Sequence, residues 1–245
     1  MSKAENLKIK KSNIKNSSFK ELSIIKNFIF WVDIISYGPT PNNAIFARPF
    51  NDKNAIPQQL TGDNFYIKSN FHGYGGKSYQ CMEVYDQIYL VWIDQISKAL
   101  WLLILKAQEV VPKNDNEYFL CDTEPRQLTE VIESNFDTSF IISRNKFLYG
   151  LCEIKNRDYL FSLDLTKTKQ KIRTIKKFDN FAGNLSSNPK GNLFSWIEWN
   201  SDHMPWEKNF LFFARIDNGG NIPVSYTHLR AHETSLHLVC RLLLE

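Results

Sequence analysis

The chain has 245 residues, enough for one large domain or two small ones with a buried core. Hydrophobic residues make up 43% and charged residues 23%, an ordinary balance for a globular protein, and ten glycines are too few for a low-complexity chain. The formal net charge of +4 is not concentrated on any segment, which argues against a nucleic-acid-binding protein.

Residues 1–26 are expected to form an N-terminal arm and a first strand region. The basic cluster from Lys8 to Lys20 is interpreted as solvated, because no aromatic residue that could stack on bases occurs before Phe19. The apolar stretch from Leu22 to Tyr37 carries charges, is too short to cross a bilayer and lies too far in for a signal peptide. We therefore expect a cytoplasmic protein with no nucleic-acid or membrane partner.

Residues 27–222 are expected to form the folded domain, built from strands. Apolar runs rich in β-branched and aromatic residues occur in pairs, each pair joined by a polar turn. The pairs are 27–35 with 44–50, 87–94 with 99–106, 146–154 with 158–165, and 192–200 with 209–217. A helical period occurs only at Glu130–Phe136.

The pairs repeat about every 45–60 residues, which is the length of a four-stranded propeller blade. Two pairs are followed by the same closing phrase, IPQQLTGD at 56–63 and EPRQLTEV at 124–131. The sequence therefore predicts an all-β fold, an incomplete β-propeller of about four blades of four-stranded antiparallel sheet. A two-sheet sandwich is the structural alternative.

The glycine-rich phrase FHGYGGKSY at 71–79 ends like a phosphate-binding loop. Its opening glycine would have to stand at Phe71, and no helix is expected after it, so this interpretation is rejected. Instead, Gly73, Gly75 and Gly76 are expected to form a tight strand entry with positive φ or close backbone approach.

The remaining candidate residues are interpreted as structural rather than functional. Pro189 and Gly191 in SSNPKGN are expected to form a turn. His203 is interpreted as a turn histidine packed beside Trp206, since no Ser or Cys nucleophile can be paired with it. The scattered Cys81, Cys121 and Cys152 are expected to be reduced, buried thiols, with no metal or cofactor.

Three phrases of the chain occur in a fixed order: NFHGYGGKSY (70–79), FDNFAGNLSSNPKG (178–191) and NPKGNLFSWIEWNSDHMPWEKNFLFFARID (188–217). They resemble the H-E-Y-G-G-G, D-F-Y-x-x-P-x-x-S-P-D-G and S-P-D-G-x-x-x-x-W-x-x-W-D-H-P-x-M-P-W-D phrases of the prolyl oligopeptidase family of serine peptidases, most closely its acylaminoacyl-peptidase or dipeptidyl-aminopeptidase-like branch. Gly73 stands where the family has Glu. The matching residues, given structural roles, are His72, Tyr74, Gly75, Gly76, Pro189, Gly191, Trp196, Trp199, Met204, Pro205 and Trp206.

The resemblance covers roughly 28–217 and implies the N-terminal propeller of a serine oligopeptidase. In that family catalysis belongs to a following α/β-hydrolase domain, with a Ser on a G-x-S-x-G elbow. The chain contains no G-x-S-x-G, so no catalytic residue is nominated. The resemblance implies a gate for short peptides, whose partner is the missing hydrolase domain of the same parent chain.

Two other functions fit the repeats alone, because repeats specify a fold and not a function. The first is a stand-alone propeller used as a binding scaffold. The second is a propeller enzyme with a central metal, such as a lactonase, for which His72 and His203 offer few ligands.

Residues 223–245 differ from the rest in composition, with six Leu and no Lys, Asn, Ile, Phe, Gly or Asp. Back-translation of Val224–Thr234 resembles a transposase adapter of short-read libraries, and that of Leu238–Glu245 resembles the flow-cell sequence that follows the sample index. The gap between them has the length of an index. We interpret this tail as translated adapter. The alternative is a helix with His228 and His232 spaced to bind metal.

Overall fold

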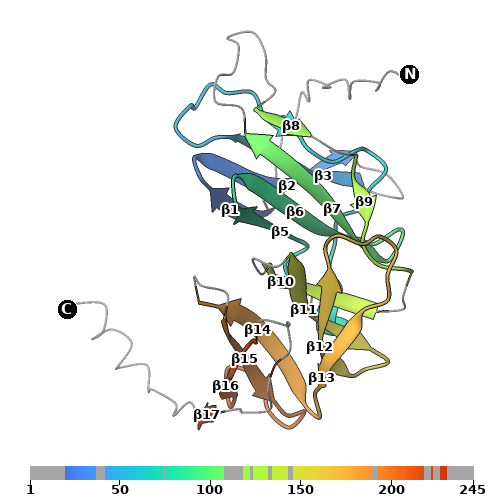
Figure 1. Ribbon diagram of the computed structural model, residues 1–245, viewed down its shortest axis with the longest axis vertical. Helices are drawn as coiled ribbons and strands as arrows, with labels where there is room; N and C mark the ends of the chain where they lie inside the picture. Colours follow the sequence, from blue (N-terminus) through green and yellow to red (C-terminus); the bar gives the residue numbers. More distant parts are fainter. Residues whose placement is uncertain are drawn as a thin grey trace, which may run out of the picture. The chain divides into compact units, whose positions relative to one another are not determined.

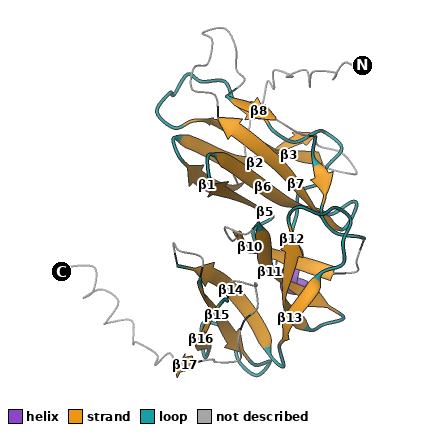
Figure 2. Ribbon diagram, in the orientation of Figure 1, coloured by secondary structure: helices purple, strands orange, loops and turns teal. Residues whose placement is uncertain are grey.

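The computed structural model describes residues 20–36, 42–73, 75–107, 118–121, 124–131, 134–142, 146–188, 192–217, 222 and 227–230. Within these ranges the chain is all-β, with a single turn of 3-10 helix, η1 (Phe71–Gly73), as its helical part (Figure 2). Across the described residues, no helix is long and apolar enough to cross a membrane.

The strands form four antiparallel sheets, coloured in chain order in Figure 1. The first sheet consists of β1 (Lys20–Ile25), β2 (Phe28–Ser36), β3 (Asn42–Pro49) and β4 (Gln58–Gln59). The second consists of β5 (Tyr79–Val84), β6 (Gln87–Asp94), β7 (Ala99–Ala107) and β8 (Phe119–Cys121), with β9 (Arg126–Gln127) also paired to β7. The third consists of β10 (Ser134–Ile142), β11 (Phe147–Ile154), β12 (Asp158–Asp164) and β13 (Arg173–Lys177). The fourth consists of β14 (Phe181–Ser187), β15 (Leu193–Trp199), β16 (Phe210–Arg215) and β17 (Thr227–Arg230).

The predicted fold is confirmed: each sheet is one blade of an incomplete four-bladed propeller. The predicted strand pairs are the second and third strands of the four blades. The helical period at Glu130–Phe136 was misleading. In the structure β10 begins at Ser134, within this segment, and the side chain of Phe136 in that strand is buried. β1 lies within residues 1–26, which were expected to hold an arm and a first strand region, and it forms the edge of the first blade. β17 lies in the adapter-like tail, so the part of the tail around His228 that the structure describes is a strand rather than a helix.

The chain divides into two compact units, 1–138 with 166–171, and 139–165 with 172–245. In the first unit, the first two blades share one hydrophobic core. Its members include Phe30, Val32, Ile45, Ala47, Leu60, Ile88, Leu90, Trp92, Leu103 and Phe119. The ring of Phe119 lies 4.5 Å from that of Phe28 and 5.5 Å from that of Phe30. Because β2 and β6 are covered on both faces, they appear in the sequence as continuous apolar runs rather than alternating ones.

The closing phrase Q-L-T has the same geometry in both blades that carry it. Thr61 and Thr129 are fully buried, and their hydroxyl oxygens accept the N–H groups of Ile45 at 2.9 Å and Leu100 at 3.0 Å. Each leucine of the phrase donates its N–H to the carbonyl of the same partner residue, at 2.8 and 2.7 Å. The phrase therefore forms the short outer strands β4 and β9 on the third strand of each blade.

The residue before this phrase reaches the next blade along the chain. The buried Gln58 accepts the N–H groups of Tyr118 at 2.8 Å and Phe119 at 3.0 Å, and its own amide donates to the Phe119 carbonyl at 3.2 Å. Arg126 holds the equivalent position in the second phrase and donates to the Lys167 carbonyl at 3.0 Å. Polar side chains at one repeat position thus connect successive blades.

In the second unit, aromatic contacts join the third and fourth blades. The rings of Tyr149 in β11 and Phe194 in β15 meet edge to face at 5.0 Å. Both side chains are buried, and burial raises the pKa of Tyr149. Aromatic side chains therefore pack between neighbouring blades here and in the first unit.

Two of the cysteines are buried free thiols, as predicted. Burial raises the pKa of Cys81 in β5 and of Cys152 in β11, so both stay protonated and unreactive at neutral pH. The third predicted thiol, the side chain of Cys121 in β8, lies outside the description, as does Cys240.

Candidate functional site: a polar cavity beside the glycine-rich loop

The glycine-rich phrase forms a tight entry into β5, as the sequence predicted. Backbone φ is 51° at His72, 73° at Gly73 and 79° at Gly75, all in the region that favours glycine. A Cβ on Gly76 would lie 3.0 Å from Oδ1 of Asp137, so this position also requires close approach. The phrase leads into a strand and not a helix, which excludes a phosphate-binding loop. Tyr74 lies outside the described residues.

The segment before this phrase is held by two side chains, the buried Asp94 and the partly buried Asn43. The carboxylate of Asp94, at the end of β6, accepts the N–H groups of Tyr66 and Ser97, each at 2.9 Å. The side chain of Asn43 in β3 exchanges two hydrogen bonds with the backbone of Ile67, at 2.6 and 2.8 Å. The backbone at 66–67 is therefore fixed to both blades of the unit.

The end of the phrase is anchored to β1 by Glu21. Its carboxylate accepts the N–H of Ser78 at 2.5 Å and the hydroxyl of Ser78 at 2.9 and 3.0 Å. Burial raises the pKa of Glu21, and the hydrogen bonds from Ser78 oppose that rise. The hydroxyl of Tyr79 donates to the Glu21 carbonyl at 2.5 Å, so β1 and β5 are joined at this point.

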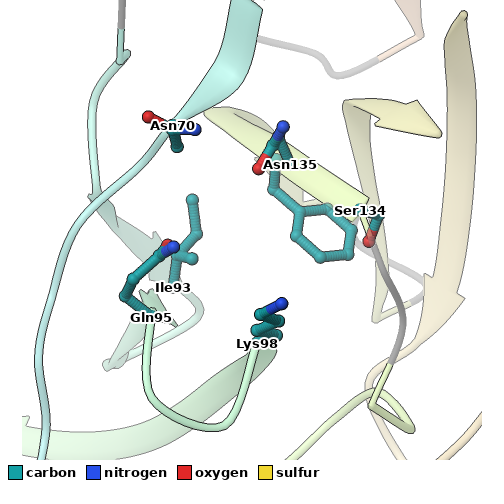
Figure 3. Close-up of a pocket in the computed structure, with 7 residues that line it drawn as sticks. Asn70, Ile93, Gln95, Lys98, Ser134 and Asn135 are labelled. Carbon is teal, nitrogen blue, oxygen red and sulfur yellow. The ribbon is translucent and has the colours of Figure 1, made fainter. Parts of the chain in front are cut away.

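Between these anchors lies a cavity of about 300 Å³ (Figure 3). Three segments contribute to it: the loop before β5, the turn from β6 to β7, and the start of β10. Its lining residues are Asn70, Ile93, Gln95, Lys98, Ser134, Asn135 and Phe136. The hydroxyl of Ser69 donates to the Phe136 carbonyl at 2.7 Å and holds β10 against the loop. Sequence reasoning missed these lining residues, because they come from a loop, from β6 and the turn after it, and from the start of β10, which only the fold brings together.

In the second unit, the M-P-W phrase forms a compact turn between β15 and β16. The N–H of Met204 donates to a carboxylate oxygen of Glu207 at 2.8 Å, and the amide of Asn209 donates to the Pro205 carbonyl at 2.6 Å. Trp206 is 77% exposed, so it presents its ring to solvent rather than to the core. The turn position of His203 is confirmed by its N–H bond to the Asn200 carbonyl at 3.2 Å.

The two tryptophans before this turn are structural. Trp196 is fully buried, stacks on Phe212 at 5.9 Å and donates its indole N–H to Glu198 at 2.8 Å. Trp199 stacks on Phe181 at 5.8 Å, and a Cβ on Gly183 would lie 3.1 Å from the Trp199 ring. Pro189 and Gly191, the predicted turn before β15, lie outside the described residues.

A partly buried cation completes the environment of Trp196. Lys176 in β13 forms an ion pair of 2.6 Å with Glu198 and lies 4.6 Å from the ring centroid of Phe178, 5.2 Å from that of Trp196 and 5.1 Å from that of Phe212. This three-ring cage joins the third and fourth blades through a charge that is paired and enclosed.

Within the described ranges, no group of three or more His, Cys, Asp or Glu side chains is placed to hold a metal ion. The described His72 and His203 do not lie in a cluster of this kind. The cavity beside the glycine-rich loop is therefore a binding site candidate and offers no nucleophile with a paired base.

Comparisons with known proteins give the fold a context. No family model and no curated protein matches the chain. A puromycin-hydrolyzing peptidase of Mycobacterium tuberculosis is similar in structure, with a TM-score of 0.64 and 15% identity over 86% of this chain and 32% of that chain. A puromycin hydrolase is also similar, with a TM-score of 0.64 and 14% identity over 90% of this chain and 33% of that chain. The structure of a mutant puromycin hydrolase in a complex gives a TM-score of 0.65. The likeness covers most of this chain, and the chain spans about a third of the length of these peptidases.

Proposed function

We propose that this chain is the N-terminal propeller part of a serine oligopeptidase of the prolyl oligopeptidase family, and that it gates the access of short peptides to an α/β-hydrolase domain. The observation that carries the proposal is the fold likeness to peptidases three times its length, over 86–90% of this chain. The ordered phrases in the sequence point to the same family independently of the fold.

The chemistry belongs to the missing domain under this proposal. The chain has no G-x-S-x-G elbow, and the thiols of Cys81 and Cys152 are buried and protonated. A propeller without a nucleophile contributes by excluding folded proteins and admitting peptides that fit past its blades. The partner is the hydrolase domain of the same parent chain, and the reduced thiols agree with a cytoplasmic location.

The fourth blade supports a longer parent chain. On one face of β15 and β16, Ile197 pairs with Leu211 and Ser195 pairs with Phe213, and all four side chains are only partly buried. The opposite face, with Phe194 and Trp196, is buried against the third blade. Blades normally cover both faces with their neighbours, so this face fits a further blade.

A stand-alone binding scaffold is the second candidate. The exposed Trp206, held in a hydrogen-bonded turn, favours it, because rigid exposed tryptophan is the residue type most enriched at interaction hot spots. This reading needs no downstream domain.

The test compares three proteins: the 245-residue chain, the parent reading frame, and the parent with the elbow Ser replaced by Ala. Aminoacyl anilides, short peptides and puromycin, the substrate named for the similar structures, serve as probes. We expect hydrolysis by the parent alone, with a folded protein left intact. Hydrolysis by the 245-residue chain, or an inactive parent, would contradict the proposal.

A further inference from the structure

The cavity beside the glycine-rich loop carries an inference of its own. We propose that it binds a carboxylate group carried on a short apolar stem, with Lys98 as its cation. This inference rests on the cavity alone and does not depend on the proposed function.

The charge of the cavity favours an anion. Among the lining residues Lys98 alone is charged, and in Figure 3 its ammonium end points into the space between the labelled side chains. Asn70, Gln95 and Asn135 add side-chain amides that can donate to an oxygen ligand. The cavity therefore offers one positive charge and several neutral donors, and no carboxylate lines it.

The acidic residues nearby are engaged elsewhere. The carboxylate of Asp94 accepts backbone N–H groups of Tyr66 and Ser97. Oδ1 of Asp137 lies beside Gly76, 3.0 Å from the place that a Cβ on this glycine would take. Both carboxylates still contribute to the electrostatic potential near the cavity, but neither is among the residues that line it. Lys98 is therefore the charged group that faces a ligand.

A second, independent observation is the hydroxyl of Ser134. Its oxygen is buried and has no hydrogen-bond partner among the described residues. A buried hydroxyl without a partner is costly, because it has lost water and gained nothing in exchange. A ligand oxygen in the cavity would supply that partner.

The floor of the cavity defines the rest of the ligand. Ile93 is 4% exposed and Phe136 is 1% exposed, so the inner wall is apolar while Asn70 and Lys98 at the rim are exposed. A volume of about 300 Å³ lies at the small end of ligand sites. One cation over an apolar floor matches a carboxylate with a branched aliphatic stem, whereas a phosphate dianion would need a second cation.

The experiment is calorimetric titration of the full chain with four probes: N-acetyl-L-leucine, isovalerate, N-acetyl-L-leucinamide and inorganic phosphate. We expect both carboxylates to bind, and the uncharged amide and phosphate to bind at least about tenfold more weakly. Tighter binding of N-acetyl-L-leucine than of isovalerate identifies a peptide C-terminus as the source, and the reverse order identifies a free small carboxylate.

Two variants and one matched control locate the site. Lys98→Met keeps the stem and the same backbone strain, since φ is 50° at this position for either residue. Ser134→Ala removes a hydroxyl that has no partner in the free protein, so it should fold at least as well as wild type. Each should weaken carboxylate binding, Lys98→Met by about tenfold or more, whereas Lys106→Met, an exposed lysine of β7 outside the cavity, should not.

Three results would overturn the inference. One is no binding of either carboxylate to a folded chain. Another is unchanged affinity in Lys98→Met whose circular dichroism matches wild type. The third is phosphate binding tighter than either carboxylate.

Discussion

The buried side chain of Gln58 joins the first two blades through three hydrogen bonds, and its replacement gives a sharp prediction. Gln58→Met keeps the volume of the side chain and removes its three hydrogen bonds to the backbone of Tyr118 and Phe119. Each net hydrogen bond contributes about 1 kcal/mol, and the backbone groups left behind are buried, so the free energy of unfolding should fall by about 3 kcal/mol. For a chain of this size that lowers the melting temperature by roughly 6–12 °C.

The assay is urea denaturation followed by tryptophan fluorescence, with Gln59→Met as the matched control. Gln59 is the next residue, partly exposed, and donates to the Thr61 carbonyl and to Asp63, both at 2.8 Å. Its replacement should cost no more than about 1 kcal/mol, because water can replace an exposed partner. If Gln58→Met costs as little as Gln59→Met, the Gln58 hydrogen bonds do not hold the blades together and the reasoning is refuted.

Three further predictions concern the other anchors. Lys176→Met should lower the free energy of unfolding, measured by urea denaturation, by about 3 kcal/mol, because it leaves Glu198 buried without its cation. Adding Glu198→Gln should recover part of that loss. If the effects of the two substitutions simply add in this double-mutant cycle, the two side chains are not coupled and the prediction is wrong. Gly75→Ala should cost about 1–2 kcal/mol, since φ is 79° and the new Cβ would lie 3.2 Å from the Ser69 carbonyl oxygen; a neutral effect on the melting temperature would show that the loop relaxes freely. Burial raises the pKa of the Glu21 carboxyl in the folded state, so the stability that its protonated form contributes is present below the unfolded-state pKa and is lost as pH rises through the folded-state pKa. Wild type should therefore lose stability relative to Glu21→Gln as pH increases from about 4. A stability difference between the two proteins that does not change with pH would contradict this sign.

The inner strands could be predicted from sequence because burial on both faces leaves a continuous apolar run. QIYLVWID became β6, buried at seven of its eight positions. The outer strands β4 and β9 have two residues each, too few for any periodicity, and only the repeated Q-L-T phrase marked them. At β10 the local period was misleading, because pairing in a sheet and burial of Phe136 outweigh a weak helical pattern.

The glycine positions of the loop were predictable, because positive φ and close approach restrict the residue type. The cavity was not, because Asn70, Lys98 and Asn135 come from a loop, a turn and the start of a strand, and their convergence depends on blade packing. The exposure of Trp206 was not predicted either, because a large apolar side chain is usually covered and only the turn between β15 and β16 presents it to solvent. Tertiary placement, rather than residue type, decides these features.

The central claim is that this chain is the propeller part of a longer peptidase, and rereading the source DNA beyond the codon for Ile222 tests it most directly. The account predicts that the frame continues through further blades to a G-x-S-x-G, followed in order by an Asp and a His. A frame that closes a propeller and stops would contradict the peptidase and support the scaffold. The tail codons recovered from genomic DNA would contradict the adapter interpretation of 223–245.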